Sequence, residues 1–166
     1  MSNLHIVPFQ AQHWPQLWPI LRDTFQRGDT YAFPTDWDEA QTRHAWIDVP
    51  VHTFVAVDDA GMVLGSYYLK PNQLGGGSHV ANCGYVVSAA ASGRGIASQM
   101  CRHSQDEARR LGFLAMQFNF VVSSNSRAVA LWQHLGFTIV GTLPLAFRHP
   151  QHGLVDAYVM HKPLHH

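Results

Sequence analysis

The sequence predicts an α/β fold in which a mixed sheet of about six or seven strands carries helices on both faces. Apolar residues make up 46% of the 166-residue chain and charged residues 13%, which is typical of a globular protein. A strand pattern ending at Val86 and Val87, a helical pattern starting at Ile96 and a strand pattern over 114–122 form a βαβ unit with parallel strands. Because no repeat or linker interrupts the chain, we expect one domain over residues 1–166.

The first half of the chain is expected to contain two helices and three strands. Pro15 and Pro19 fall at the start of the first helix, where proline is tolerated only within the first turn. The expected elements are a strand over 4–9, a helix over about 14–25, a loop over 27–36, a helix capped by Asp36 or Asp38 that reaches residue 47, and a hairpin of strands over 53–57 and 62–69.

The second half is expected to alternate strands with helices and to end in two strands. A glycine-rich loop precedes it over 71–78. The expected elements are a strand over 80–87, a helix from Ile96 to about residue 111 that stops at Gly112, a strand over 114–122, a helix over about 126–135, and strands over 137–143 and 155–162.

A turn of small residues over 89–95 joins the strand over 80–87 to the following helix. Backbone N–H groups at such an elbow point along the helix axis, where the helix dipole adds positive potential, so a phosphate or pyrophosphate is the natural ligand. A Walker loop is excluded because Ile96 and Ala97 follow the last glycine, and the dinucleotide fingerprint is incomplete because Ser98 replaces its third glycine. Taken alone, the elbow is equally well explained as a tight strand-to-helix turn.

The elbow resembles the acyl-CoA loop of the GCN5-related N-acetyltransferases, whose signature is Q/R-x-x-G-x-G/A. Ser92, Gly95 and Ala97 stand at its three defined positions, and Ser92 departs from the usual Gln or Arg. The resemblance implies an acetyltransferase fold with acetyl-CoA bound between the two central parallel strands. The cofactor-binding residues that it implies are Val86, Val87, Ser92, Gly93, Arg94, Gly95, Ile96, Ala97, Asn125 and Trp132.

A second block strengthens this resemblance. Residues 125–137 read N-x-x-A-x-x-L-W-x-x-x-G-F, which is similar to the family's N-x-x-A-x-x-L-Y-x-x-x-G-F with Trp132 in place of Tyr. Asn125 could serve only as a helix N-cap, or could also hydrogen-bond the pantetheine arm. Trp132 fits a core-facing aromatic by its helical period, and Arg94 fits either a solvated turn or an ionic contact to CoA.

The chemistry of acetyl transfer narrows the catalytic candidates. A tetrahedral oxyanion needs hydrogen-bond donors, and the resemblance implies the backbone N–H around Val87. The strands over 80–87 and 114–122 contain no acid, and the indole of Trp132 cannot replace the tyrosine that often acts as general acid. A thiol with a pKa of about 8.5 leaves as a thiolate without much help, so we expect catalysis mainly by positioning. Asp156 is a candidate base near the end of the sheet.

Two asparagines stand in otherwise apolar strands, Asn82 and Asn119. They predict either a cross-strand amide pair or a substrate-facing pair with a catalytic role near the thioester. Together with Asn125 they resemble the pattern of the fungal L-azetidine-2-carboxylate N-acetyltransferase group, which implies small cyclic amino acids as acceptors. Thr30, Tyr31 and Phe33 match the place where family members build the acceptor pocket.

The function expected from these features is N-acetylation of a small-molecule amine, such as an amino acid or analogue, by acetyl-CoA. The alternatives are another amine (a protein N-terminus, an aminoglycoside or a polyamine) and a non-catalytic CoA-binding regulatory module. Ser92, Trp132 and the missing acids favour the module. An acidic groove would favour polycations, and no acidic cluster is evident in the sequence.

Composition limits the partners and the setting. Eleven basic and eleven acidic residues give zero net charge, so we expect no nucleic-acid or membrane partner. Cys83 and Cys101 fall in core elements, which favours buried thiols, and the start of the chain lacks a signal-peptide pattern, so a cytoplasmic location is expected. We expect no metal, because no Cys or carboxylate stands at ligand spacing near His149 and His152. A homodimer is possible by the family resemblance.

Overall fold

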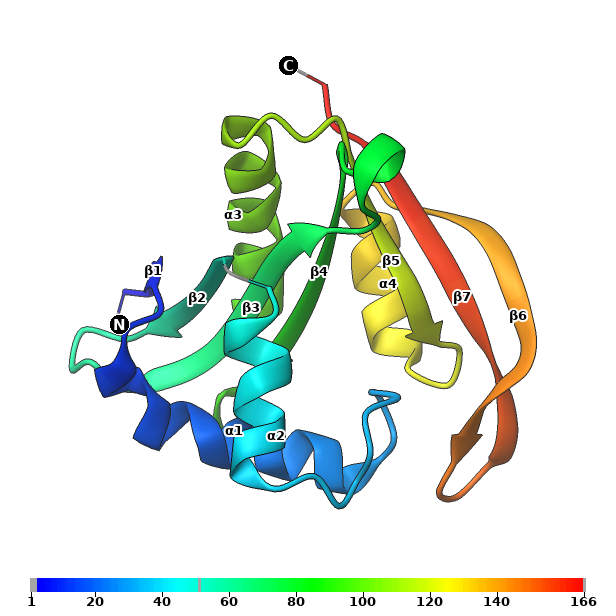
Figure 1. The fold of residues 1–166 in the computed structure, drawn as a ribbon. Helices are drawn as coiled ribbons and strands as arrows, with labels where there is room; N and C mark the ends of the chain where they lie inside the picture. Colours follow the sequence, from blue (N-terminus) through cyan, green and yellow to red (C-terminus); the bar gives the residue numbers. More distant parts are fainter. Residues whose placement is uncertain (1–2, 51, 166) are drawn as a thin grey trace.

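The computed structural model describes residues 3–50 and 52–165, and it contains a seven-stranded mixed sheet (Figure 1). Met1 and Ser2 lie outside the described residues. They belong to the start of the chain, where the sequence shows no signal-peptide pattern. The strands are β1 (His5–Pro8), β2 (His52–Val57), β3 (Val63–Pro71), β4 (Val80–Val87), β5 (Ala115–Val122), β6 (Thr138–His149) and β7 (Gly153–Pro163). Their order is β1-β2-β3-β4-β5-β7-β6, and only β4 and β5 pair in parallel.

Helices cover both faces of this sheet. They are α1 (Trp14–Arg27), α2 (Glu39–Arg43), α3 (Ile96–Arg110) and α4 (Ser126–His134), with a π-helical turn over His44–Asp48 directly after α2. Short 3₁₀ turns cover Ala11–His13, Gly75–Gly77 and Ala89–Ala91. The mixed sheet and the parallel βαβ unit confirm the fold class predicted from the sequence. Within the described residues, no helix is long and apolar enough to span a membrane.

Each face of the sheet has its own hydrophobic core. On one face, Met100 and Cys101 of α3 and Trp132 of α4 pack against strand residues such as Leu69 and Cys83. On the other face, α1 and the π-helical turn bury an aromatic cluster around Phe25 and Trp46, which packs against β3 and β4. Both cysteines are free and buried, as the sequence predicted. The two cores hold β4 and the first turn of α3 in place, and the site is built on these elements.

The N-terminal helical segments agree with the prediction in position but differ in detail. Asp38 caps α2, since its carboxylate accepts a hydrogen bond from the Gln41 backbone N–H at 2.8 Å. Pro19 lies inside α1, which contradicts the expectation that proline would be confined to the first turn. The bond that Pro19 cannot make would go to the carbonyl of Pro15, near the start of the helix, where a lost intrahelical bond disrupts least.

The last two strands are longer than predicted. The expected strands ended at 143 and began again at 155, whereas β6 continues to His149 and β7 begins at Gly153. A register shift between Leu143 and Phe147 interrupts the alternation, and Leu145 has a φ of 50°. The irregular stretch looked like a loop in the sequence because a bulge breaks the period-2 pattern on which strand prediction depends.

Candidate active site

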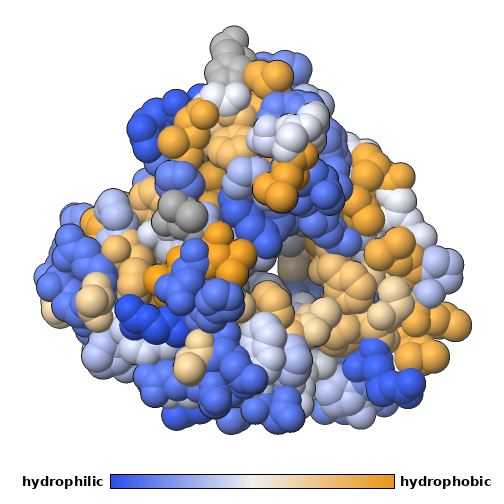
Figure 2. All heavy atoms as spheres, viewed as in Figure 1, coloured by the Kyte–Doolittle hydropathy of each residue, from blue (hydrophilic) through white to orange (hydrophobic). Residues whose placement is uncertain are grey.

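A cavity of about 830 Å³ opens where β4 and β5 separate. Figure 2 shows the hollow near the centre of this face, with apolar side chains of β6 and β7 gathered to one side. The strands pair only at their starts, with Val80 opposite Ala115 and Ala81 opposite Met116. Beyond this point the two strands diverge (Figure 1), so their facing edges line the cavity.

Asn82 holds the strands together just beyond their last paired residues. Its side-chain amide donates a hydrogen bond to the backbone carbonyl of Gln117 on β5 at 3.0 Å. The residue is 8% exposed, so this bond satisfies a polar group that would otherwise be buried without a partner. Asn82 therefore marks the point at which the sheet opens, and past it the edge of β4 that faces β5 has no partner strand.

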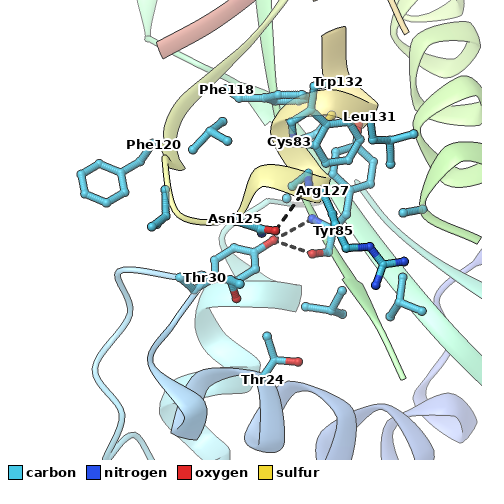
Figure 3. A pocket seen from close by; sticks show the side chains of 18 of the residues that line it. Thr24, Thr30, Cys83, Tyr85, Phe118, Phe120, Asn125, Arg127, Leu131 and Trp132 are labelled. Carbon is cyan, nitrogen blue, oxygen red and sulfur yellow. Dashed lines mark hydrogen bonds between the residues drawn. The ribbon is translucent and has the colours of Figure 1, made fainter. Parts of the chain in front are cut away.

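Tyr31 occupies the exposed edge of β4. Its hydroxyl accepts a hydrogen bond from the Tyr85 backbone N–H and donates one to the Tyr85 carbonyl, each at 2.7 Å (dashed lines at Tyr85 in Figure 3). The Tyr31 ring stacks on Phe33 at 5.8 Å with 4° between the planes and packs against Phe25. Burial raises the pKa of Tyr31 well above its usual value, so the phenol stays protonated and can make both bonds.

The elbow between β4 and α3 forms an open cradle of backbone groups. Gly93 and Gly95 have φ values of 80° and 74°, which only glycine adopts without strain. A methyl group added to either glycine would meet no atom within 4 Å, so their surroundings are open. Of the predicted elbow residues, Ser92, Gly93, Gly95, Ile96 and Ala97 line the cavity. Arg94 is exposed and is not among the lining residues.

The start of α4 forms the facing wall. Asn125 is the N-cap, with its side-chain oxygen accepting from the Ala128 backbone N–H at 3.4 Å, and it also lines the cavity (Figure 3). Trp132 is 8% exposed and lies between Tyr85 and Phe118, with ring centroids 5.0 and 5.1 Å away. The core position predicted for Trp132 is therefore confirmed, and the same ring also forms part of the cavity wall.

The predicted acceptor residues come together on the other side of the cavity. Thr30, Tyr31 and Phe33 approach from the loop between α1 and α2, and Asn82 and Asn119 approach from the sheet. The alternative of an Asn82–Asn119 pair is not what the described hydrogen bonds show, because Asn119 donates to the Asn72 side chain at 2.6 Å. Asn119 is also exposed, contrary to the buried position expected from its apolar neighbours in sequence.

Among the described residues that line the cavity there is no aspartate or glutamate, while Arg27, Lys70 and Arg127 contribute positive charge. Asp156, the candidate base, is not among them. Its carboxylate accepts from the Leu145 backbone N–H at 2.9 Å and so supports the bulge in β6. Cys83 lines the cavity, but burial raises the pKa of its thiol strongly, so it remains protonated and is a poor nucleophile.

Tyr85 and Lys70 also line the cavity, and neither was predicted from the sequence to belong to the site. The Tyr85 side chain packs into the α3 face, and the backbone N–H and C=O of this residue face Tyr31 in the cavity. No sequence pattern shows which backbone edge of a strand is left unpaired, so the position of Tyr85 could not be predicted. Lys70 could have been singled out, because it is the only charged residue in the apolar strand β3.

A sequence model of the acetyltransferase (GNAT) family matches residues 14–137. The chain belongs to this family. The family predicted from the elbow and the second block is thereby confirmed, whereas the roles given to individual site residues, Val87 included, stay predictions.

The relatives of the chain agree with this assignment. The chain is 36% identical over 105 residues to the N-acetyltransferase aca1 of Schizosaccharomyces pombe, an alignment that covers 63% of this chain and 50% of that protein. The chain thus spans about half the length of this curated relative.

Solved structures show the same fold. A GCN5-related N-acetyltransferase from Kribbella flavida is 44% identical, with a TM-score of 0.93 over 97% of this chain and 98% of that one. A phosphinothricin acetyltransferase from Sinorhizobium meliloti, solved in complex with AcCoA, has a TM-score of 0.85 at 21% identity and covers 98% and 88% of the two chains.

The Tyr31 contact makes a prediction about stability. Tyr31→Phe should lower the free energy of unfolding by about 1–2 kcal/mol, because the N–H and C=O of Tyr85 lose their partner. The measurement is urea unfolding followed by tryptophan fluorescence.

Tyr68→Phe is the matched control. Tyr68 packs on Trp46 in the same aromatic cluster, and no hydrogen bond of its hydroxyl is found among the described residues. It should lose markedly less stability than Tyr31→Phe. Equal losses of unfolding free energy in the two variants would show that the Tyr31–Tyr85 hydrogen bonds do not stabilise the fold.

Proposed function

We propose that this protein transfers an acetyl group from acetyl-CoA to the amine of a small molecule, an amino acid or amino-acid analogue. The observation that carries the proposal is one cavity that contains both the opened backbone edge of β4 and the glycine elbow at the start of α3. A thioester needs a donor for its oxygen, and a CoA pyrophosphate needs a cradle of N–H groups. Both features lie in this cavity.

The elbow fits the phosphate end of acetyl-CoA. Free N–H groups at the start of the 15-residue helix α3 carry partial positive charge, and the open space at Gly93 and Gly95 lets a phosphate approach closely. We assign pyrophosphate contacts to the cavity-lining elbow residues, and pantetheine contacts to Val86, Val87, Asn125 and Trp132. Two proteins of the same fold, the Sinorhizobium meliloti enzyme and yncA from Salmonella typhimurium, were solved with acetyl-CoA, which supports this ligand.

The backbone N–H of Tyr85 is the donor that we assign to the thioester oxygen, next to the Val87 N–H already predicted. An oxygen acceptor, the Tyr31 hydroxyl, already lies 2.7 Å from the Tyr85 nitrogen. That is within the range in which an oxyanion donor acts, 2.7–3.1 Å. The thioester oxygen and the Tyr31 hydroxyl therefore compete for the same N–H, and Tyr31 must shift when the acetyl group binds.

No carboxylate among the described lining residues can act as the general base that accepts the proton of the amine. None of the described lining residues is acidic, so the amine must lose its proton to water or react from its neutral fraction. A leaving thiol with a pKa of about 8.5 needs no strong acid. We therefore assign most of the rate to positioning and to stabilisation of the oxyanion, and expect the rate to rise with pH as more of the acceptor amine is neutral.

The acceptor is assigned to the side of the cavity lined by Thr30, Tyr31, Phe33, Asn82 and Asn119. Aromatic and amide groups together suit a small, partly apolar amine. The resemblance to the fungal L-azetidine-2-carboxylate N-acetyltransferase group makes small cyclic amino acids the first acceptors to test. We also propose that the chain acts as a single cytoplasmic domain, alone or as a homodimer.

Thiol release from acetyl-CoA tests this proposal. We expect turnover with L-azetidine-2-carboxylate and related amino acids, little with polyamines or an aminoglycoside, and a rate that increases from pH 7 to pH 9. Tight binding of acetyl-CoA without thiol release on any amine would instead favour a regulatory CoA-binding module.

Gly95→Glu should weaken acetyl-CoA binding by at least about tenfold, measured by calorimetric titration, because a carboxylate at the start of α3 repels the pyrophosphate. Gly112→Glu is the matched control. It has a φ of 89°, open surroundings and a position just past the other end of the same helix, so it introduces similar backbone strain. Equal affinities in the two variants would remove the elbow from the site.

Asn119→Ala should lower kcat by about tenfold while changing the Kd for acetyl-CoA less than twofold, since the amide faces the acceptor. Asn72→Ala is the matched control. It removes the same Asn119–Asn72 hydrogen bond, but Asn72 itself does not line the cavity. If both variants behave alike in steady-state kinetics, Asn119 acts only through that bond and has no direct role.

A further inference from the structure

Lys70 projects from the end of β3 into the acceptor side of the cavity. It lies directly opposite Asn82 in the antiparallel pair, so both side chains are on the same face of the sheet. Its ammonium nitrogen is 5.7 Å from the centre of the Tyr68 ring, and the residue is half-buried and lines the cavity. A cation–π contact of this kind orients the side chain but neutralises no charge.

Lys70 has no ion-pair partner among the described residues. The described lining residues include no acid. Arg27 differs, because its guanidinium nitrogen lies 3.7 Å from the carboxylate of Asp29. Arg127 is also different, because it lies in the first turn of α4 beside Asn125, on the wall assigned to pantetheine.

The position of Lys70 along the sheet separates it from the elbow. Asn82, its partner, precedes Val87 by five residues of β4, or about 16 Å at the rise of a strand. The CoA pyrophosphate at the elbow is therefore out of reach. Tyr85 is about 10 Å from Asn82 along the same strand, a distance that a lysine side chain and a bound amino acid can span together.

We propose that Lys70 is the specificity residue that binds the carboxylate of the acceptor. This inference rests on the proposed function and narrows its acceptor to an anionic amine, an amino acid rather than a neutral or polycationic one. The ammonium of Lys70 pairs with the carboxylate, and the neighbouring amide of Asn82 lies within reach of the same molecule. The acceptor nitrogen is then directed along β4 toward the thioester at Tyr85.

The test compares an acid with its amide in wild type, Lys70→Met and Lys70→Arg. The probes are L-azetidine-2-carboxylate and its carboxamide, and each variant is compared with wild type on the same probe, so the different basicity of the two amines cancels. We expect Lys70→Met to raise KM for the acid by about tenfold or more, with KM for the carboxamide and the Kd for acetyl-CoA within twofold. Lys70→Arg should keep most of the affinity for the acid.

Arg22→Met is the matched control, because Arg22 also lies over an aromatic ring, Trp18 at 5.9 Å, but does not line the cavity. It should match wild type on both probes. Equal losses on the acid and the carboxamide in Lys70→Met would overturn the inference and leave Lys70 a structural role. Unchanged KM for the acid would overturn it as well.

Direct binding of the two probes, measured by calorimetry, separates this inference from the proposed function. Binding of the acid that depends on Lys70, without acetyl transfer to any amine, would support the carboxylate site and refute the acetyltransferase proposal. Acetyl transfer to the acid, with binding of the acid unchanged in Lys70→Met, would support the acetyltransferase proposal and refute the carboxylate site at Lys70.

Discussion

The pairing of β4 with β5 stops after two residues of each strand, and the site is built around this opening in the sheet. Two parallel strands that stay paired bury their backbone groups, whereas these strands pair at two positions and then diverge. The Tyr85 N–H and C=O are thereby left to bind a group from outside the sheet, and in this structure that group is the Tyr31 hydroxyl. The same divergence opens the cavity and brings the elbow and the start of α4 to its walls.

The features predicted from sequence are those set by local chemistry. The period of apolar residues located the α-helices and strands found in the described part of the chain, and glycines at positions of positive φ marked the elbow. Asp38 and Asn125 cap helices as their side chains and positions suggested. Trp132 faces the core as its helical spacing required. Each of these features depends on residues close together in the chain, which a sequence pattern can report.

The features missed depend on tertiary structure. Tyr31 and Tyr85 are 54 residues apart, and their contact requires the α1–α2 loop to lie over the open edge of β4. The position of Lys70 beside the site depends on the strand register that places it opposite Asn82, and this register cannot be read from the sequence near Lys70. Asp156 was expected near the chemistry, but its carboxylate holds the bulge that gives Leu145 a positive φ. That bulge also concealed the full length of β6, because it disrupts the alternation of a regular strand.

We infer that the Tyr31 hydroxyl occupies the position of the thioester oxygen at the Tyr85 N–H. The decisive experiment is a crystal structure of the protein with acetyl-CoA. We expect the thioester oxygen within hydrogen-bonding distance of the Tyr85 nitrogen, with the Tyr31 hydroxyl moved from its 2.7 Å contact. A complex in which acetyl-CoA is fully bound while Tyr31 keeps both bonds to Tyr85 would contradict it.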